Sequence, residues 1–454
     1  MSLDDDKLKF AGEVKVDKIT IFTPSGFSQE VTAQVQAISI YESIHKTFID
    51  GNVIIKESLD FANLFPLTGQ EFIRLEIRTP GLGDFGKIDA TYMLYKMTDR
   101  EILGDKSVAY QLHFMSLEGL VGLNKKVSKL YTGNIGDLVQ EILQDQENGL
   151  ETGKSITVEP VVKTHQYVSN FWTPVENLQY LTMQAVNADN APYVLFENRD
   201  GFNFVTLEAM YDAGEPYQTF SKDNYTRDDL GTGADAKNPG EDYKKIIDMN
   251  IEVGYDYITR LKSGFFGSRQ YSYDLFTKKY TVKDFNIYRE FESNTLKTLN
   301  PFPAMPSGGI NRNAAAQMTY IKISNIFSDF TEYDGDTSNY DRIQRRKSLL
   351  AMAQTNVLNI TVPGRVDYTA GMKVSVTLPL ISPLNPEDTD YFDKRWSGNY
   401  VIASINHHIN KESHECTMEL ISDSLQMSAE DGSDEARSGL NEVATENAAR
   451  SGVQ

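Results

Sequence analysis

The chain has 454 residues, enough for two to four domains, and a formal net charge of −20 at neutral pH. This charge argues against nucleic acid as an attractive partner, although it suits a surface past which nucleic acid slides. One cysteine, Cys416, excludes an internal disulfide and suggests a reducing compartment. We expect no membrane helix, because no apolar run approaches about 20 residues, and no signal peptide, because the start "MSLDDDKLKF" is acidic and polar.

Strand patterns dominate the sequence after a short N-terminal arm (1–12). Residues 13–125 contain about six stretches in which apolar and polar residues alternate, and "EVKVDKITIFT" (13–23) is the clearest. The segment 91–116 is typical of a long hairpin. This run of short strands predicts an antiparallel β-barrel or sandwich, and we favour a barrel.

The character of the sequence changes over residues 126–215, for which we predict an α+β domain. Apolar residues at helical spacing predict one helix over 134–147 and a second over 173–189. Thr173 and Glu176 have the spacing of a capping box at the start of the second helix. Two aromatic strands joined by a tight turn follow it.

A polar, turn-rich linker (216–242) precedes a second block of strands, 243–258 and 345–425. The intervening residues 259–344 are aromatic without a clear period, so we expect an inserted irregular domain. The end, 426–454, is charged and rich in small residues, which is typical of a flexible tail. The expected fold class is mainly β with α+β insertions, with two antiparallel β-barrel domains and smaller α/β domains.

The two strand blocks resemble each other, which indicates an internal repeat. Each has a glycine turn, then an alternating strand, then a hairpin that begins at a tyrosine. The landmarks are Gly69 and Tyr92 in the first block and Gly371 and Tyr400 in the second. We interpret the pattern as a duplicated barrel, and the sparse identities leave coincidence as the alternative.

Two glycine-rich stretches look like phosphate-binding loops, and we interpret both as turns. "GLETGKS" (149–155) has too few residues between its first glycine and Gly-Lys-Ser, and it lies between a predicted helix and a strand, the reverse of the required order. "GLGDFG" (81–86) matches the dinucleotide fingerprint, but a strand follows it where a helix is needed. We therefore predict no nucleotide site and expect Lys154 to be an exposed turn lysine.

The last hairpin contains His407, His408, His414 and Cys416. Alternation along a strand places Cys416 on one face with His414 and His408, while zinc would need a fourth converging ligand. We expect exposed histidines on a hairpin and leave a zinc site as the alternative. No catalytic signature is recognisable, so we expect a structural part with no enzyme activity, no cofactor and no metal.

Three stretches occur in the order found in a known family. They are "NFWTPVENLQYL" and its continuation (170–205), "RIQRRKSLLAMA" and its continuation (342–376), and the closing hairpin (399–422). In pattern they resemble the baseplate central hub proteins of contractile-tailed bacteriophages, which are related in fold to the hub part of type VI secretion spike proteins. The aromatic region 260–340 is longer here than in that family.

The resemblance implies a homotrimer with two tail-tube-like barrels in each chain. Six similar units would then adapt a three-fold central spike to a six-fold tail tube around a channel for DNA. The implied partners are other copies of the chain, the central spike protein and a tail tube or tube-initiator protein, with baseplate wedge and tape measure proteins as further candidates. DNA would pass without specific binding, the chain would not insert into a membrane, and it would reside in the virion baseplate after assembly in the host cytoplasm.

We expect acidic side chains on the channel wall, where like charge keeps phosphates from binding. The candidates in the two hairpins are Asp99, Glu101, Glu412 and Glu415. The alternative is that the charge keeps the outer surface soluble. Alternative functions are a receptor-binding adhesin, a tail-associated cell-wall hydrolase and a polymerising tube protein.

Overall fold

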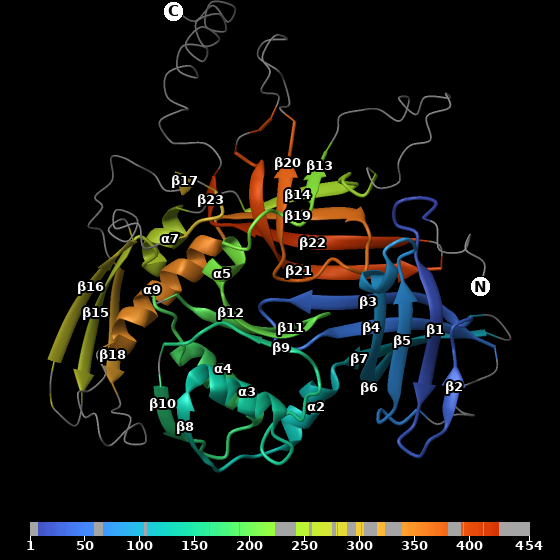
Figure 1. The fold of residues 1–454 in the computed structure, drawn as a ribbon, viewed down its shortest axis with the longest axis horizontal. Helices are drawn as coiled ribbons and strands as arrows, with labels where there is room; N and C mark the ends of the chain where they lie inside the picture. The colour runs from blue at the N-terminus through green and yellow to red at the C-terminus, as the bar shows by residue number, and fades with distance from the viewer. Residues whose placement is uncertain are drawn as a thin grey trace, which may run out of the picture.

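The computed structural model places most of the chain in a β-rich body with several helices (Figure 1). It describes residues 8–58, 67–103, 107–162, 164–189, 191–222, 242–253, 257–274, 278, 280–287, 297–300, 302–303, 316–322, 338–379, 392–393, 395–411 and 413–425. The expected flexible tail, 426–454, and the candidate Glu412 lie outside these residues. The predicted fold class, mainly β with antiparallel sheets and a few helices, is confirmed.

The first sheet unit is built from strands of the N-terminal part of the chain, which neighbour one another in the order β3-β4-β7-β6-β5-β1-β2. All of these pairs are antiparallel. The strands are β1 (Lys15–Phe22), β2 (Ser28–Glu30), β3 (Val35–Ser43), β4 (Asp50–Glu57), β5 (Phe72–Arg78), β6 (Lys87–Leu103) and β7 (Ser107–Met115).

The second sheet unit has the order β14-β19-β22-β21-β20-β13. Its strands are β13 (Thr219–Ser221), β14 (Asp248–Val253), β19 (Asn356–Pro363), β20 (Lys373–Thr377), β21 (Gly398–Asn410) and β22 (His414–Ser422). β13 lies in the segment expected to be a linker; it pairs in parallel with β20 over only three residues, too short a run to show an alternating pattern.

The two units share one topology. When the six main strands of each unit are numbered along the chain, β2 aside, both sheets have the order 1-4-5-6-3-2. The long fifth strand carries a β-bulge at the same place in both, between Leu94 and Lys96 in β6 and between Ile402 and Ser404 in β21. The first strand differs, because β1 is antiparallel to its neighbour and β13 is parallel.

The repeat landmarks occupy matching positions in these units. Tyr92 pairs with Ile73 and Tyr400 pairs with Val374, and each tyrosine lies two residues before the bulge. Gly69 and Gly371 precede the fourth strands with φ angles of +87° and +88°, a left-handed conformation that favours glycine.

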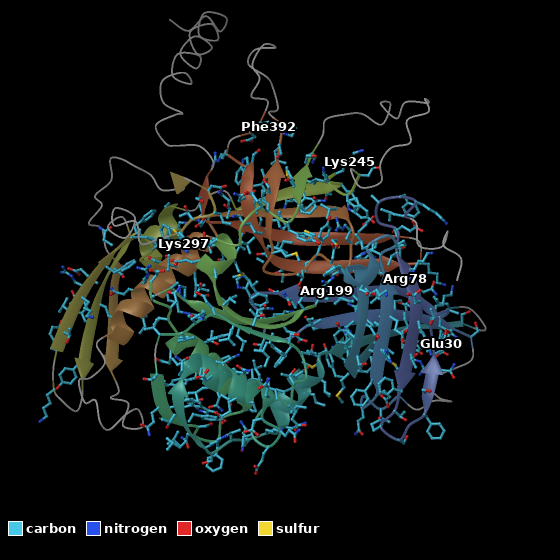
Figure 2. The ribbon with its side chains drawn as sticks, in the orientation of Figure 1. Glu30, Arg78, Arg199, Lys245, Lys297 and Phe392 are labelled. Carbon is cyan, nitrogen blue, oxygen red and sulfur yellow. The ribbon has the colours of Figure 1, made fainter. Side chains whose placement is uncertain are left out.

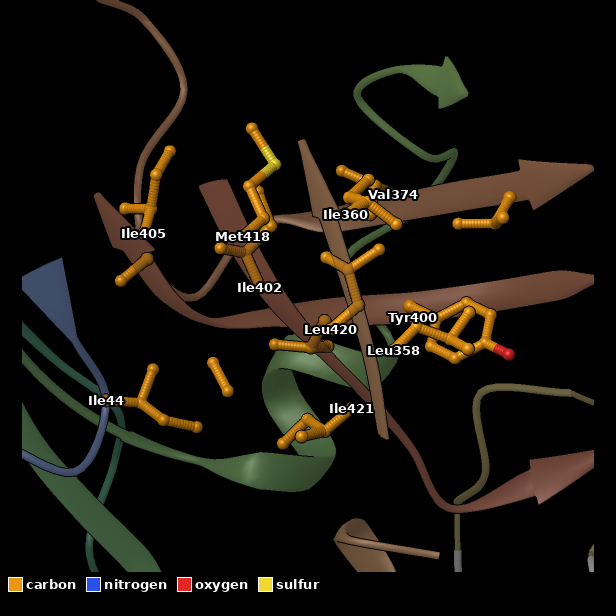
Figure 3. Packing of buried hydrophobic residues seen from close by; sticks show 14 of the residues in the cluster. Ile44, Leu358, Ile360, Val374, Tyr400, Ile402, Ile405, Met418, Leu420 and Ile421 are labelled. Carbon is orange, nitrogen blue, oxygen red and sulfur yellow. The ribbon is translucent and has the colours of Figure 1, made fainter. Parts of the chain in front are cut away.

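The two units join directly into one sheet, because β3 of the first pairs with β21 of the second over seven residues. Each unit nevertheless curves around its own core. In the second, buried aliphatic side chains from β19, β20, β21 and β22 pack together (Figure 3). In the first, strands β1, β3, β4, β5, β6 and β7 all contribute to one cluster.

The α+β domain has a third core between its helices and two small sheets. Thr173 accepts a hydrogen bond from the Glu176 amide, and the Glu176 carboxylate accepts one from the Thr173 amide, so the structure has the capping box. The second helix ends at Gln184, earlier than the pattern suggested. The elements are α2 (Leu117–Asn124), β8 (Leu130–Asn134), α3 (Ile135–Gln144), β9 (Ile156–Val158), β10 (Thr164–Val168), α4 (Pro174–Gln184), β11 (Tyr193–Asn198), β12 (Gly201–Thr206) and α5 (Leu207–Tyr211).

The insertion expected to be irregular contains a three-stranded sheet, ordered β16-β15-β18, and two helices. Its strands alternate tyrosine with small and charged residues, so they lack the aliphatic period that marks strands elsewhere. A small aromatic core includes Phe265, Phe266 and Ile287. The elements are α7 (Tyr257–Ser263), β15 (Gly267–Asp274), β16 (Tyr280–Asn286), β18 (Ala316–Lys322) and α9 (Ser338–Ala353), and a short pair is made by β17 (Phe302–Pro303) and β23 (Ser424–Leu425).

Candidate functional site

One face of the long sheet is polar from β14 to β6 and spans both units. Register aligns alternate residues of eight neighbouring strands on this face, to which β6 contributes from Lys96 onward. Ser39 is buried, and at one end the same register reaches the buried Val357, Ile421 and Val401. We call it the polar face, and its members include Asn250, Asn359, Thr361, Thr417, Asn406, Ser404, Ser39, Tyr41, Ser43, Asn52, Gln111, His113 and Thr98.

Side chains on the polar face hydrogen-bond across strand boundaries. The hydroxyls of Ser43 and Ser404 lie 3.0 Å apart, so the bond crosses the junction of the two units. Farther along the same junction, the Ser39 hydroxyl lies 3.2 Å from Nδ1 of His408. Thr98 makes a similar contact of 2.8 Å with His113. These short neutral side chains therefore bond to one another across the strand boundaries.

The charges on this face are mainly negative. Its lysines are Lys56 and Lys96, whereas its acids are Asp50, Glu101, Asp248, Glu252, Glu415 and Glu419. Two of the four proposed channel acids, Glu101 and Glu415, therefore lie on the polar face. Asp99 is exposed at a second bulge of β6 with a φ of +54°, next to that face.

The opposite face of the sheet is covered by the other domains. Phe196 of β11 and Leu207 and Met210 of α5 belong to the core of the second unit. These added elements therefore pack on the core side of the second unit. A mainly polar sheet face with an acidic balance is suited to line an aqueous passage.

Two strand edges have free backbone groups among the described residues. In this part of the chain β14 pairs only with β19, and β6 beyond its first bulge, from Lys96, pairs only with β7. Both edges carry exposed aliphatic side chains: Ile247 and Ile251 are 55% and 40% exposed, and Ile102 is 79% exposed. An apolar open edge is a template for pairing with another strand.

A buried carboxylate ties three parts of the chain together. Glu42 of β3 accepts hydrogen bonds from the Arg199 amide (3.1 Å), the Thr369 hydroxyl (2.6 Å) and the Ala370 amide (3.0 Å). Arg199 lies in the β11–β12 turn, between the two sheet units (Figure 2), and its guanidinium donates to the carbonyls of Phe85 and Val366. The Asn-Arg-Asp-Gly turn was visible in the sequence, but nothing there indicated what it would contact.

The prediction that Lys154 is simply an exposed turn lysine was wrong. Lys154 donates to Glu118 at 2.7 Å and to Glu197 at 2.5 Å, and the side chains of these acids are 7% and 1% exposed. The loop itself follows α3 and leads into β9, and the "GLGDFG" segment contains a 3₁₀ turn (Gly83–Gly86) and leads into β6, so neither loop opens a helix, as the two turn interpretations expected.

The expected exposure of the histidines was also wrong, because His407 and His414 are buried together with Cys416. His408, which alternation had grouped with Cys416, points to the polar face instead. The β21–β22 register pairs His407 with Cys416 and His408 with Glu415. Across this hairpin odd residues oppose even ones, so a face cannot be followed by parity from one strand to the next.

Comparison with known proteins places this architecture among phage tail proteins. The chain is 22% identical over 414 residues to a probable baseplate hub protein, gp334, of Vibrio phage KVP40, covering 88% of this chain and 92% of that protein. No protein family profile matches the chain.

Two solved structures share the fold. One is the tail protein from Neisseria meningitidis MC58, with a TM-score of 0.52 at 11% identity, covering 90% of this chain and 97% of that one. The other is the 43 kDa tail protein of prophage MuSo2 from Shewanella oneidensis, with a TM-score of 0.52 at 8% identity, covering 90% and 99%. Among the described residues, no helix has the length and apolar character to cross a bilayer.

Proposed function

We propose that this chain is a structural protein of a phage baseplate hub, and that three copies close a ring around a channel. The similarity to a probable hub protein of Vibrio phage KVP40 supports the hub role. The fold shared with two tail proteins supports a place in a phage tail. The proposal includes no catalytic role.

The main observation that supports a ring is the duplicated topology, together with the pairing of β3 with β21 that joins the two units. β3, the second strand of the first unit, pairs with the fifth strand of the second unit, β21. By equivalence, β14 is the second strand of the second unit and β6 is the fifth strand of the first. Both have open edges in one chain. We therefore expect β14 of one copy to pair with β6 of the next copy, in the way that β3 pairs with β21 inside the chain.

The register of this contact follows from the internal junction. There, residues 404–410 of β21, just beyond its bulge, pair with residues 37–43 of β3. The equivalent part of β6 begins at Lys96 and ends near Leu103. We therefore propose that residues 96–103 pair with β14 of the neighbouring copy. Ile251 and Ile102 would then be covered.

Such a contact is head-to-tail, and contacts of this kind generate rings when the rotation closes. The resemblance to hub proteins implies three copies in the ring, and two sheet units in each copy then give six similar units. A three-fold spike protein could then attach to one end of the ring, and a six-fold tail tube or tube-initiator protein to the other. Wedge and tape measure proteins remain candidate outer partners.

The polar face would line the channel of this ring. Residues of the α+β domain join the core side of the second unit, so a ring with that domain outside would have the polar face inside. Six acids against two lysines would repel phosphates along the wall. DNA would then pass without specific binding.

The test is the mass of the full chain in solution, measured by light scattering, with one variant at each edge. Wild type is expected to be a trimer. Ile251→Lys on β14 and Ile102→Lys on β6 should each shift the population to monomer, because a lysine at a paired edge opposes strand addition. Ile258→Lys is the matched control, since Ile258 is 65% exposed and lies on α7, not on β14 or β6.

The outcomes separate two claims. A wild-type monomer at concentrations well above those in an infected cell would overturn the ring. A trimer that persists in both edge variants would keep the ring and overturn the strand pairing. Cleavage of cell-wall glycan by the purified chain would favour the hydrolase alternative.

A further inference from the structure

Three side chains that commonly bind metals meet on the buried face of the β21–β22 hairpin. Nδ1 of His407 lies 3.1 Å from Nε2 of His414, and Sγ of Cys416 lies 3.3 Å and 3.4 Å from these nitrogens. The three residues are 1%, 0% and 0% exposed. They are the metal-ligating cluster found among the described residues.

The distances suit one shared ion. Zinc binds histidine nitrogen at about 2.0–2.1 Å and thiolate sulfur at about 2.3 Å, so ligand atoms in a tetrahedral site are separated by roughly 3.3–3.6 Å. The observed separations of 3.1–3.4 Å are within about 0.2 Å of that range. A further oxygen, the carbonyl of Arg365, lies 3.9 Å from Sγ of Cys416.

The surroundings hold the ligands in place. Gly364 packs so closely on the His414 ring that a Cβ there would lie 2.3 Å from it. The His414 amide donates to Gly12, and its carbonyl accepts from Gly364. Both ligand strands are central in the sheet.

One buried polar atom of this cluster is unsatisfied: Nδ1 of His414 has no hydrogen-bond partner. Burial lowers the pKa of both histidines. Burial raises the pKa of the Cys416 thiol, and the nearby Asp367 and Glu42 raise it further. Those carboxylates would offset the charge of a bound cation, against the nearby cations of Arg199 and Arg365.

We propose that His407, His414 and Cys416 bind one borderline-soft divalent metal ion, with Zn²⁺ the best match to two imidazoles and a thiolate. Binding displaces the thiol proton to solvent and leaves the thiolate as a ligand. The ion joins β21 to β22 on the strand that also pairs with β3. Because the site is buried, the ion enters as the hairpin forms and stabilises the folded chain.

The experiment uses the full chain, produced with a tag that contains no histidine. The chain is unfolded with chelator and refolded with Zn²⁺, with Co²⁺ or with neither, and its metal content is measured by mass spectrometry. We expect about one ion per chain, a thiolate-to-cobalt charge-transfer band and a higher melting temperature with metal. Cys416→Ser and His407→Gln should reduce bound metal by roughly tenfold or more.

His408→Gln is the matched control, since His408 is adjacent in sequence but lies on the other face. It should bind metal like wild type. A wild-type chain that refolds without stoichiometric zinc and without a thiolate–cobalt band would overturn the site. This measurement does not depend on whether the variants fold. Equal metal content in wild type and in Cys416→Ser would overturn it as well.

Discussion

Nζ of Lys154 lies 2.5 Å from Oε1 of Glu197, a side chain that is 1% exposed in the α+β domain. The same ammonium group donates to Glu118 at 2.7 Å. Burial raises the pKa of Glu197, while the charge of Lys154 lowers it. The lysine therefore compensates two acids that water does not reach.

Removing this ammonium group should destabilise the fold. Lys154→Met keeps most of the aliphatic stem and leaves two buried carboxylates without their cation, so we expect a loss of roughly 3 kcal/mol in the free energy of unfolding. Urea denaturation measures it. Lys126→Met, which removes an exposed ion pair with Glu176, should cost about 1 kcal/mol or less. Equal effects of the two substitutions would contradict the buried role.

The buried carboxyl group of Glu42 should make the stability of the fold depend on pH. Burial raises the pKa of Glu42 to about 7 from an ordinary 4.5, although its carboxylate accepts three hydrogen bonds that lower it. The folded state therefore holds a proton that the unfolded state releases. This contribution is fully present below pH 4.5, falls as pH rises to about 7, and then stays constant.

The change should amount to about 3 kcal/mol between these limits. Comparing urea midpoints of wild type and Glu42→Gln from about pH 5 to about pH 8 isolates it, because the amide does not titrate. Glu42→Gln should not show the fall in stability with rising pH that wild type shows. Glu30→Gln, at an exposed position on β2 (Figure 2), should behave as wild type. Parallel pH curves for wild type and Glu42→Gln would show that Glu42 does not titrate in this range.

The two landmark glycines should respond differently to the same substitution. Both have left-handed φ angles, so alanine costs about 1–2 kcal/mol at either. At Gly69 an added Cβ meets nothing nearer than 3.7 Å, whereas at Gly371 it lies 2.8 Å from the Phe196 ring. Overpacking should add about 1–3 kcal/mol to Gly371→Ala alone. Thermal melting of the pair of variants measures the difference, and equal costs would show that the Phe196 ring moves aside freely.

Charge on the polar face should control retention of DNA. Glu101→Lys and Glu415→Lys together change the face from acidic to nearly neutral, so the assembled protein should bind duplex DNA at low salt and release it near physiological salt, where the screening length is about 8 Å. Filter binding measures this. Two lysines introduced at exposed positions outside the sheet, at Glu147 and Glu215, serve as the control. Equal binding by both variants would place the polar face outside the channel.

Sequence patterns predicted the mainly β fold class, because alternation and glycine turns are local signals. Thr173 and Glu176 were found for the same reason. The His407–Cys416 pairing could not be predicted, since it depends on which residues form the turn of the hairpin. The partners of Lys154 and Glu42 lie 36 to 43 and 157 to 328 residues away in the chain, and no local pattern encodes such contacts.

The junction between β3 and β21 has a consequence for how a ring would assemble. Its two strands belong to one polypeptide, so they meet at an effective concentration set by the chain, whatever the amount of protein in solution. In the proposed ring every second contact is of this kind. Only the alternate contacts, between β14 and β6 of separate copies, would need encounters in solution. Dilution would therefore open the ring at those places and leave each pair of sheet units intact.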